Sequence, residues 1–212
     1  MTTTKATDIG TKTRDGRSTR EAILEAASRL IHVHGYNHTS LDDVLRDSGV
    51  GKGNFYYHFK SKEELGYAIL DQIIASFLER TLEPCFADPE GRALSQIRCF
   101  LDRVLEAQRE RNCVGGCPLG NLASELSDVH EGFRARLAFV FAAWRERLTL
   151  ALRTEQLRGA VDAACRPGAV ADFLVASLEG AILLTKLTKD IAVMEQCVVE
   201  MKRYLSLFEP RV

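Results

Sequence analysis

No long run of residues in this sequence is both apolar and free of charge. The most apolar long stretch, residues 167–187, contains Asp172 and Glu179, and charges within a segment oppose its insertion into a bilayer. Residues 1–16 are polar and lack the apolar core of a secretory signal. We therefore expect a cytoplasmic protein with no membrane-spanning segment.

An excess of positive charge is also missing. The 28 lysines and arginines are matched by 29 aspartates and glutamates, which gives a formal net charge of −1. This balance excludes a protein coated in positive charge. A small basic face can still bind nucleic acid locally, so the balance leaves DNA binding open.

The chain contains no useful length of the apolar–polar alternation that marks a half-buried β-strand, and no internal repeat. Apolar residues recur instead at three- and four-residue spacing over almost the whole sequence. This spacing is typical of amphipathic α-helices. The sequence therefore predicts an all-α fold of about nine helices.

Residue patterns for catalysis or metal binding are scarce. His32 and His34 lie two apart in a predicted helix, where they point to different faces and cannot chelate together. Residues 49–54, GVGKGN, do not form a phosphate-binding loop, because Arg46 stands where the first glycine belongs and Gly53 follows the lysine. We expect no enzymatic activity, no cofactor and no bound metal.

Three serines mark predicted helix starts. Ser18, Ser40 and Ser61 are each followed three residues later by an acidic residue, which is the spacing of a capping box. Gly35 and Gly49 are typical of helix ends. The sequence predicts a first helix from residue 18 to 34, a second from 40 to 48, a third over 52–58 and a fourth from 61 to the proline at 84.

Residues 39–59 combine a short capped helix, a turn and a second short helix, which is typical of a helix-turn-helix. The second helix of such a unit enters the major groove of DNA. Its chemistry suits DNA: lysines for phosphates, glycines for a close approach of the backbone, and Asn, His and Tyr side chains for base edges and phosphates. These groups come from Lys52, Lys60, Lys62, Gly51, Gly53, Asn54, His58, Tyr56 and Tyr57.

Residues 50–65, VGKGNFYYHFKSKEEL, resemble the signature of TetR-type (TetR/AcrR) regulators, in which Tyr-Tyr-x-Phe is followed by Ser-Lys-x-x-Leu. Residues 20–41 also resemble the entry to that domain. The resemblance implies a homodimer that binds a palindromic double-stranded operator and is released by a small organic effector. It implies that Phe55 and Phe59 are core residues and that the positions facing DNA are Thr39, Ser40, Lys52, Gly53, Asn54, Tyr56, Tyr57, His58 and Lys62.

The remaining sequence predicts longer helices, over about 89–111, 119–127, 129–157, 169–187 and 190–208. The last two are expected to pair with their copies in a second subunit, because Ala176, Gly180 and Ala181 permit close approach. We expect three parts: a flexible N-terminal arm (1–17), a helix-turn-helix DNA-binding domain (18–62), and a ligand-binding and dimerisation domain (63–212). Candidate ligand-binding residues are Phe77, Phe100, Cys117, Asn121, Trp144 and Phe173.

Residues 113–126, CVGGCPLGNLASEL, resemble a stretch found in a TetR-type subgroup that responds to acrylate and to reactive electrophiles. Three interpretations of Cys113 and Cys117 remain open: packing in a tight turn, a sensor thiol for electrophiles or oxidants, and part of a metal site. Cys117 precedes a predicted helix, where its pKa could be lowered. The other four cysteines, Cys85, Cys99, Cys165 and Cys197, are expected to be reduced thiols that pack like small apolar side chains.

Overall fold

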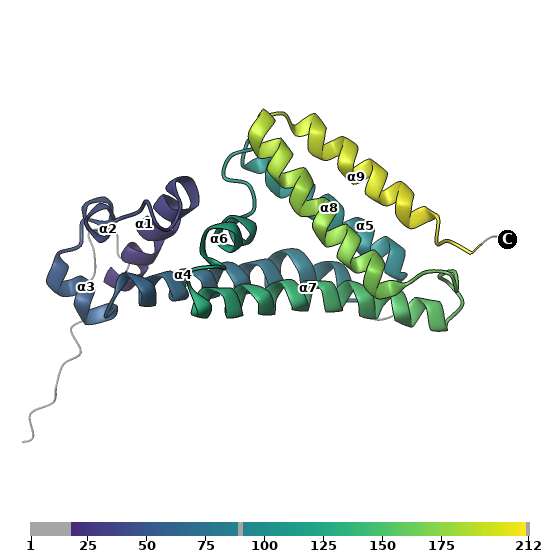
Figure 1. Cartoon of the computed structure of the whole chain (residues 1–212), viewed down its shortest axis with the longest axis horizontal. Coiled ribbons are helices and arrows are strands. Elements are labelled where there is room, and N and C mark those ends of the chain that lie inside the picture. The colour runs from purple at the N-terminus through teal and green to yellow at the C-terminus, as the bar shows by residue number, and fades with distance from the viewer. Residues whose placement is uncertain (1–17, 89–90, 211–212) are drawn as a thin grey trace, which may run out of the picture. The chain divides into compact units, whose positions relative to one another are not determined.

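The computed structural model describes residues 18–88 and 91–210, and its regular elements are helices (Figure 1). The predicted N-terminal arm lies outside these residues. The chain divides into two compact units, with the boundary between Leu70 and Asp71. The described part contains nine α-helices: α1 (Thr19–His34), α2 (Leu41–Ser48), α3 (Lys52–His58), α4 (Lys62–Phe77), α5 (Ala93–Glu110), α6 (Pro118–Leu126), α7 (Glu131–Leu157), α8 (Pro167–Thr188) and α9 (Ile191–Ser206). The predicted all-α fold is confirmed.

Capping side chains set the helix boundaries of the first unit. The Ser18 hydroxyl accepts a hydrogen bond from the Glu21 N–H (3.2 Å), and the Glu21 carboxylate accepts one from the Ser18 N–H (3.0 Å). Ser40 and Asp43 form the same reciprocal box at the start of α2. Gly49 ends α2 in the left-handed conformation, with φ of 68°. These predicted boundaries are confirmed.

The fourth helix differs from the prediction at its end. The α-helical geometry stops at Phe77, and the chain continues through a π-helix, η1 (Leu78–Leu82), into a short 3-10 helix, η2 (Glu83–Phe86). Pro84 lacks an N–H and its ring would clash with the carbonyl four residues earlier, that of Arg80. The Arg80 carbonyl accepts a hydrogen bond from Arg103 Nη2 (2.6 Å) on α5 instead. The α-helical pitch therefore ends at Phe77, seven residues before Pro84, and the chain continues past the proline as a π-helix and a 3-10 helix.

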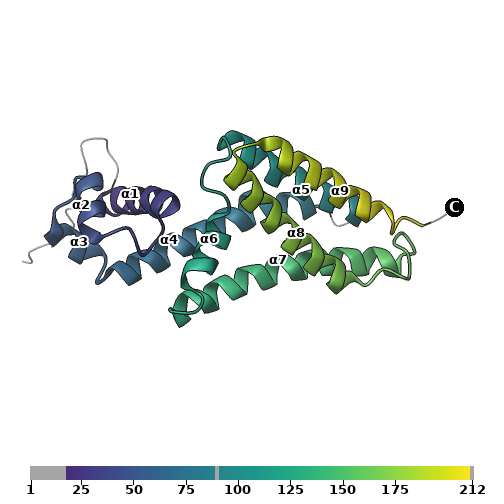
Figure 2. The same ribbon diagram turned by 45° about the horizontal axis from the view of Figure 1, so that its top comes forward.

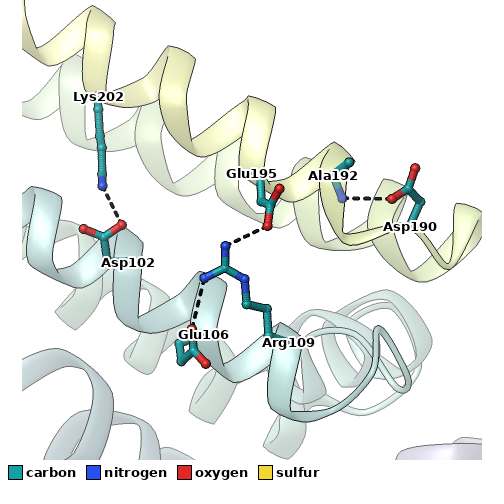
Figure 3. A network of polar contacts seen from close by, with 7 residues as sticks. All are labelled: Asp102, Glu106, Arg109, Asp190, Ala192, Glu195 and Lys202. Atoms are coloured by element: carbon teal, nitrogen blue, oxygen red, sulfur yellow. Dashed lines mark hydrogen bonds and ion pairs between the residues drawn. The ribbon is translucent and has the colours of Figure 1, made fainter.

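The second unit is a bundle in which neighbouring helices in sequence pack on one another, α7 with α8 and α8 with α9, while α5 packs on both α7 and α9 (Figure 2). The side chains shared by these helices form one continuous hydrophobic core that reaches from Leu82 to Leu205. Helices α5 and α9 are joined by two ion pairs (Figure 3), Lys202 with Asp102 and Arg109 with Glu195 (2.7 Å), and Arg109 also pairs with Glu106 on its own helix (3.1 Å). Such exposed pairs contribute little to stability.

Among the described residues, α8 is the one helix that is long and apolar enough to cross a membrane by length and composition. This is weak evidence, because the central helix of a water-soluble bundle meets the same criterion. Leu174, Leu178 and Ile182 on α8 are buried in the hydrophobic core. Packing in the core therefore explains part of its apolar character, since 39% of its most apolar 18 residues are buried.

Two phenylalanines on α7 provide a matched test of the core. Phe133 is fully buried, whereas Phe139 is 66% exposed. Phe133→Ala is expected to lower the free energy of unfolding by about 3–5 kcal/mol, because it removes buried contacts and leaves a cavity. Phe139→Ala, the same chemical change at the surface of the same helix, should lower it by less than about 1 kcal/mol. Urea unfolding of both variants checks this; equal losses would contradict the packing described for α7.

Candidate nucleic-acid interface

Helix α3 presents different chemistry on its two sides. Phe55 and Phe59, four residues apart, are 0% and 2% exposed and pack their rings on each other (5.8 Å between centroids). The opposite surface, here called the α3 face, consists of exposed residues, of which Tyr56 also packs against the Phe55 ring (5.3 Å between centroids). It contains Lys52, Gly53, Asn54, Tyr56 and Tyr57. Tyr57 is 81% exposed, which is unusual for so large a ring.

The two glycines of this region are not required by packing within the chain. A Cβ atom built at Gly51 or Gly53 would meet no other atom within 4 Å. Neither glycine has a positive φ, so backbone conformation does not require them either. Gly51 is the N-cap of α3, where glycine is favoured, and both positions leave room for a close approach from outside the chain.

Three further predicted contact residues, Ser40, His58 and Lys62, flank the α3 face. Ser40 is exposed, although its hydroxyl caps α2 through Asp43. His58 is half-buried with its ring edge against Tyr57 (5.0 Å), and Lys62 Nζ lies 4.3 Å from the centre of the Tyr36 ring. Lys62 therefore has a partner inside the unit, which fixes the position of its charge.

Thr39 does not belong with these residues. It is 2% exposed, and its hydroxyl donates a hydrogen bond to the Gly35 carbonyl (2.8 Å). The side chain closes the loop between α1 and α2 and is shielded from an approaching ligand. The prediction of Thr39 as a direct contact is corrected by this burial.

In the second unit, three of the predicted ligand-binding residues come together. The rings of Phe77, Phe100 and Trp144 lie 5.4–6.3 Å apart, and Phe141 stacks on Trp144 at 5.9 Å. We call these four residues the aromatic cluster. Trp144 is 3% exposed, and its Nε1–H has no hydrogen-bond partner among the described residues. Phe141 was not among the predicted ligand-binding residues, although its position three residues before Trp144 places it on the same helix face.

Two more of the predicted ligand-binding residues, Cys117 and Asn121, are half-buried and form a polar cluster with side chains of α8. Lys186 Nζ donates to Asn121 Oδ1 (3.2 Å), and Asn121 Nδ2 donates to the Gly115 carbonyl (2.6 Å). The Cys117 thiol faces the carboxyl group of Glu179. We call Cys117, Asn121, Glu179 and Lys186 the α6–α8 cluster. It borders the same hydrophobic core as the aromatic cluster.

Glu179 was not predicted as a site residue. Its only signal in the sequence is a charge within the most apolar stretch of the chain. Burial raises the pKa of this carboxyl group, and Oε1 is buried without a hydrogen-bond partner among the described residues. A Cβ atom at Gly120 would lie 2.3 Å from Glu179 Oε2, so glycine at that position makes room for the carboxyl group.

The expected lowering of the Cys117 pKa at the start of α6 is wrong. The thiol does accept a hydrogen bond from the Gly120 N–H (3.3 Å). Burial, followed by the charge of Glu179, nevertheless raises the pKa of Cys117 to about 12. Cys117 is therefore a protonated capping residue at neutral pH.

Phe173 lies apart from both clusters. It is 46% exposed on α8, and its ring packs on Tyr204 of α9 (4.7 Å). Its assignment to the ligand-binding set is corrected: a side chain at the surface between two helices does not line an interior site. Phe139, also exposed, lines a shallow groove of about 550 Å³ together with residues from α4, η1 and α7.

All six cysteines are free thiols. Among the described residues, no group of three or more His, Cys, Asp or Glu side chains is arranged to hold a metal ion.

Comparison with known proteins agrees with this arrangement. Residues 23–69 match the family described as bacterial regulatory proteins, tetR family, and residues 93–201 match the tetracyclin repressor-like C-terminal domain. The chain is 34% identical over 179 residues to an HTH-type transcriptional regulator encoded in the lacX 3′ region of Lactococcus lactis subsp. lactis, covering 84% of this chain and 89% of that protein.

Two solved structures extend the similarity to the whole fold. A TetR transcriptional regulator from Chloroflexus aurantiacus superposes with a TM-score of 0.83 at 29% identity, over 93% of this chain and 98% of that one. The reduced form of Escherichia coli NemR superposes with a TM-score of 0.80 at 26% identity, over 92% of this chain and 99% of that one.

The helix-turn-helix and the helical bundle together define a DNA-binding transcriptional regulator. The chain belongs to the TetR family.

Gly53 offers a test in which stability and DNA binding should change in opposite directions. Gly53→Ala is expected to stabilise the protein by about 0.5–1 kcal/mol, because alanine is the better helix former and its methyl group meets open space. DNA affinity should fall by about tenfold, because the methyl group projects from the surface that approaches the duplex. Thermal unfolding and a mobility-shift titration measure the two effects. Unchanged DNA affinity would remove Gly53 from the interface.

The state of Cys117 can be tested by alkylation. At pH 7.5 iodoacetamide is expected to modify Cys117 at least about tenfold more slowly than the exposed Cys99, because the Cys117 sulfur is buried and protonated. Peptide mass spectrometry at timed intervals gives the two rates. Rapid modification of Cys117 in the folded protein would contradict the raised pKa.

Proposed function

We propose that this regulator is a ligand-responsive repressor, a homodimer that binds a palindromic operator and is released by a small organic effector. The observation that carries the proposal is the α3 face, a set of exposed lysine, asparagine and tyrosine side chains held outward by the burial of Phe55 and Phe59. Such a face fits the major groove, and two copies related by dimer symmetry would read two half-sites.

The proposed DNA-contacting residues are the α3 face with its flanking polar groups. Lysines neutralise phosphates and set the affinity, whereas asparagine, histidine and tyrosine side chains reach base edges or phosphates. The set is Ser40, Lys52, Gly53, Asn54, Tyr56, Tyr57, His58 and Lys62. We further propose that residues 18–62 act as the DNA-binding domain, that residues 63–212 act as the ligand-binding and dimerisation domain, and that the segment 1–17 adds electrostatic contacts.

The proposed dimer surface is formed by α8 and α9. Leu183, Leu184 and Leu187 on α8 are 62%, 48% and 76% exposed, and Val199 on α9 is 59% exposed. Several exposed large apolar side chains on two neighbouring helices are typical of a protein interface. Phe173 belongs to this surface by its exposure. The pairing of two helices from each subunit would bury these side chains.

The proposed effector site lies at the aromatic cluster and the adjoining α6–α8 cluster. Phe77 is the last residue of α4, and its ring packs on Trp144 (5.4 Å). An effector that displaces Phe77 would move the end of α4. The helix continues into the DNA-binding unit, so the two states of α4 would differ in operator affinity.

A thiol sensor acting through Cys113 and Cys117 is the alternative, in line with the subgroup that residues 113–126 resemble. It has weaker support than an effector site. Cys113 is 6% exposed, and the pKa of Cys117 is raised to about 12, whereas a reactive thiol needs access and a thiolate.

The DNA-binding proposal is tested with two variants and one control. Tyr57→Ala and Lys62→Ala are each expected to weaken operator binding by about 1–3 kcal/mol in a mobility shift on a palindromic fragment from the gene's own upstream region. Tyr57→Ala should leave stability unchanged, because the side chain is 81% exposed.

The matched control is Val33→Ala on α1, which is 60% exposed and outside the proposed interface. It should bind as the unmodified protein does. Full affinity in both the Tyr57 and the Lys62 variants would refute the site.

A further inference from the structure

Cys85 and Cys99 form a pair of thiols that neither cluster of the effector site uses. Cys85 lies in η2 and Cys99 on α5, two elements that pack directly on each other. The Cys99 side chain lies near enough to the Cys85 thiol to raise its pKa. Cysteines fourteen residues apart in sequence are thereby brought together by the packing of η2 on α5.

The two thiols differ in access to solvent. Cys85 is 7% exposed, whereas Cys99 is exposed on the surface of α5. Burial raises the pKa of Cys85 to about 12, and the neighbouring Cys99 adds to this effect. Arg103 and Asp102, on the next turn of α5, are the charged groups that act on Cys85, with opposite signs. An exposed thiol beside a sheltered one is a common arrangement of an attacking and a resolving cysteine.

The pair lies at the end of the π- and 3-10-helical segment, Leu78–Phe86, that follows α4. Arg103 Nη2 donates to the Arg80 carbonyl (2.6 Å), and Arg147 Nη2 on α7 donates to the Phe86 carbonyl (2.7 Å). Arg147 Nε also lies 3.6 Å from a Glu83 carboxylate oxygen. The segment from Leu78 to Phe86 is therefore held by two arginines, one from α5 and one from α7.

We propose that Cys85 and Cys99 are a redox-active dithiol, which hydrogen peroxide oxidises to a disulfide that tethers η2 to α5 and shifts the end of α4. The site is distinct from Cys113 and Cys117. Its effect on operator binding rests on the proposed function, whereas formation of the disulfide does not.

The chemistry proceeds in two balanced steps. The Cys99 thiolate attacks one oxygen of hydrogen peroxide and the O–O bond breaks, so that with transfer of one proton the products are a Cys99 sulfenic acid and water. The Cys85 sulfur then attacks the Cys99 sulfur, an S–S bond forms, the S–O bond breaks, and the Cys85 proton leaves with the hydroxide as a second water. The peroxide is reduced by two electrons and the two thiols are oxidised by two.

Bond formation must bring the two sulfur atoms closer together. Two free thiols in contact are farther apart than the S–S bond length of about 2.05 Å. Rotation of the side chains closes part of that distance, and the rest draws η2 towards α5, on which Arg103 holds the Arg80 carbonyl. Since η2 follows α4 through the π-helix without a flexible loop, the displacement is passed to α4.

The first experiment detects the bond itself. The full-length reduced protein is treated with hydrogen peroxide, free thiols are blocked, and a non-reducing digest is examined by mass spectrometry. The expected product is a linked pair of peptides containing Cys85 and Cys99, lighter than the two reduced peptides by two hydrogen atoms and restored by dithiothreitol. Cys99→Ser should lose the product, and so should Cys85→Ser. Cys99→Ser is the safer variant because its side chain is exposed. Cys113→Ser, the control, should keep it.

Absence of the linked peptide while Cys99 is oxidised to sulfinic acid would overturn the proposal, because the resolving thiol would then be out of reach. A linkage of Cys99 to any other cysteine would overturn it as well.

The second experiment measures coupling. Oxidised protein is expected to show a shift of at least threefold in the midpoint of operator binding, reversed by dithiothreitol and absent in Cys99→Ser. A disulfide that forms with no shift would overturn the effect on α4. Failure of the proposed function looks different: the reduced, unmodified protein would then fail to bind the operator at all.

Discussion

The burial of two aromatic rings, Phe55 and Phe59, determines which side chains of α3 are exposed and therefore the surface that we propose contacts DNA. Helix α3 has seven residues and no side-chain cap at its start, so it is too short to persist on its own. The two rings fix it against the rest of its unit and determine which residues point outward. The guanidinium of Arg20 lies over the Phe59 ring at 5.2 Å, which adds a cation–π contact to the same anchor. Because Phe55 and Phe59 hold the helix in place, the exposed positions of α3 are free to carry polar and aromatic side chains.

Much of this arrangement could be predicted from the sequence, because the signals are local. Capping boxes at Ser18 and Ser40 and the turn at Gly49 depend on residues within four positions, and the structure reproduces them. The signature in residues 50–65 gave the bounds of α3 and the burial of Phe55 and Phe59. Three members of the aromatic cluster were also found, since large aromatic side chains in helical register tend to meet in a core.

The errors share one cause, which is contact between residues far apart in sequence. Pro84 reads as a helix end, but Arg103 on α5 satisfies the carbonyl that the proline displaces and the helical path continues. The family resemblance implies that Thr39 faces DNA, but its position between α1 and α2 buries it. Cys117 at a helix start reads as an activated thiol, and only the fold places a carboxyl group from α8, more than sixty residues later, against it. Periodicity and capping rules contain no information about such neighbours.

The open space around Gly51 and Gly53 has a consequence for how such a regulator can change over time. A side chain added at either position would meet no packed neighbour, so these residues can change while folding stays intact. If the α3 face reads the operator as proposed, duplicated copies of the gene gain new target sites without compensating changes in the core. The same separation makes this surface a convenient starting point for engineered repressors with altered operators.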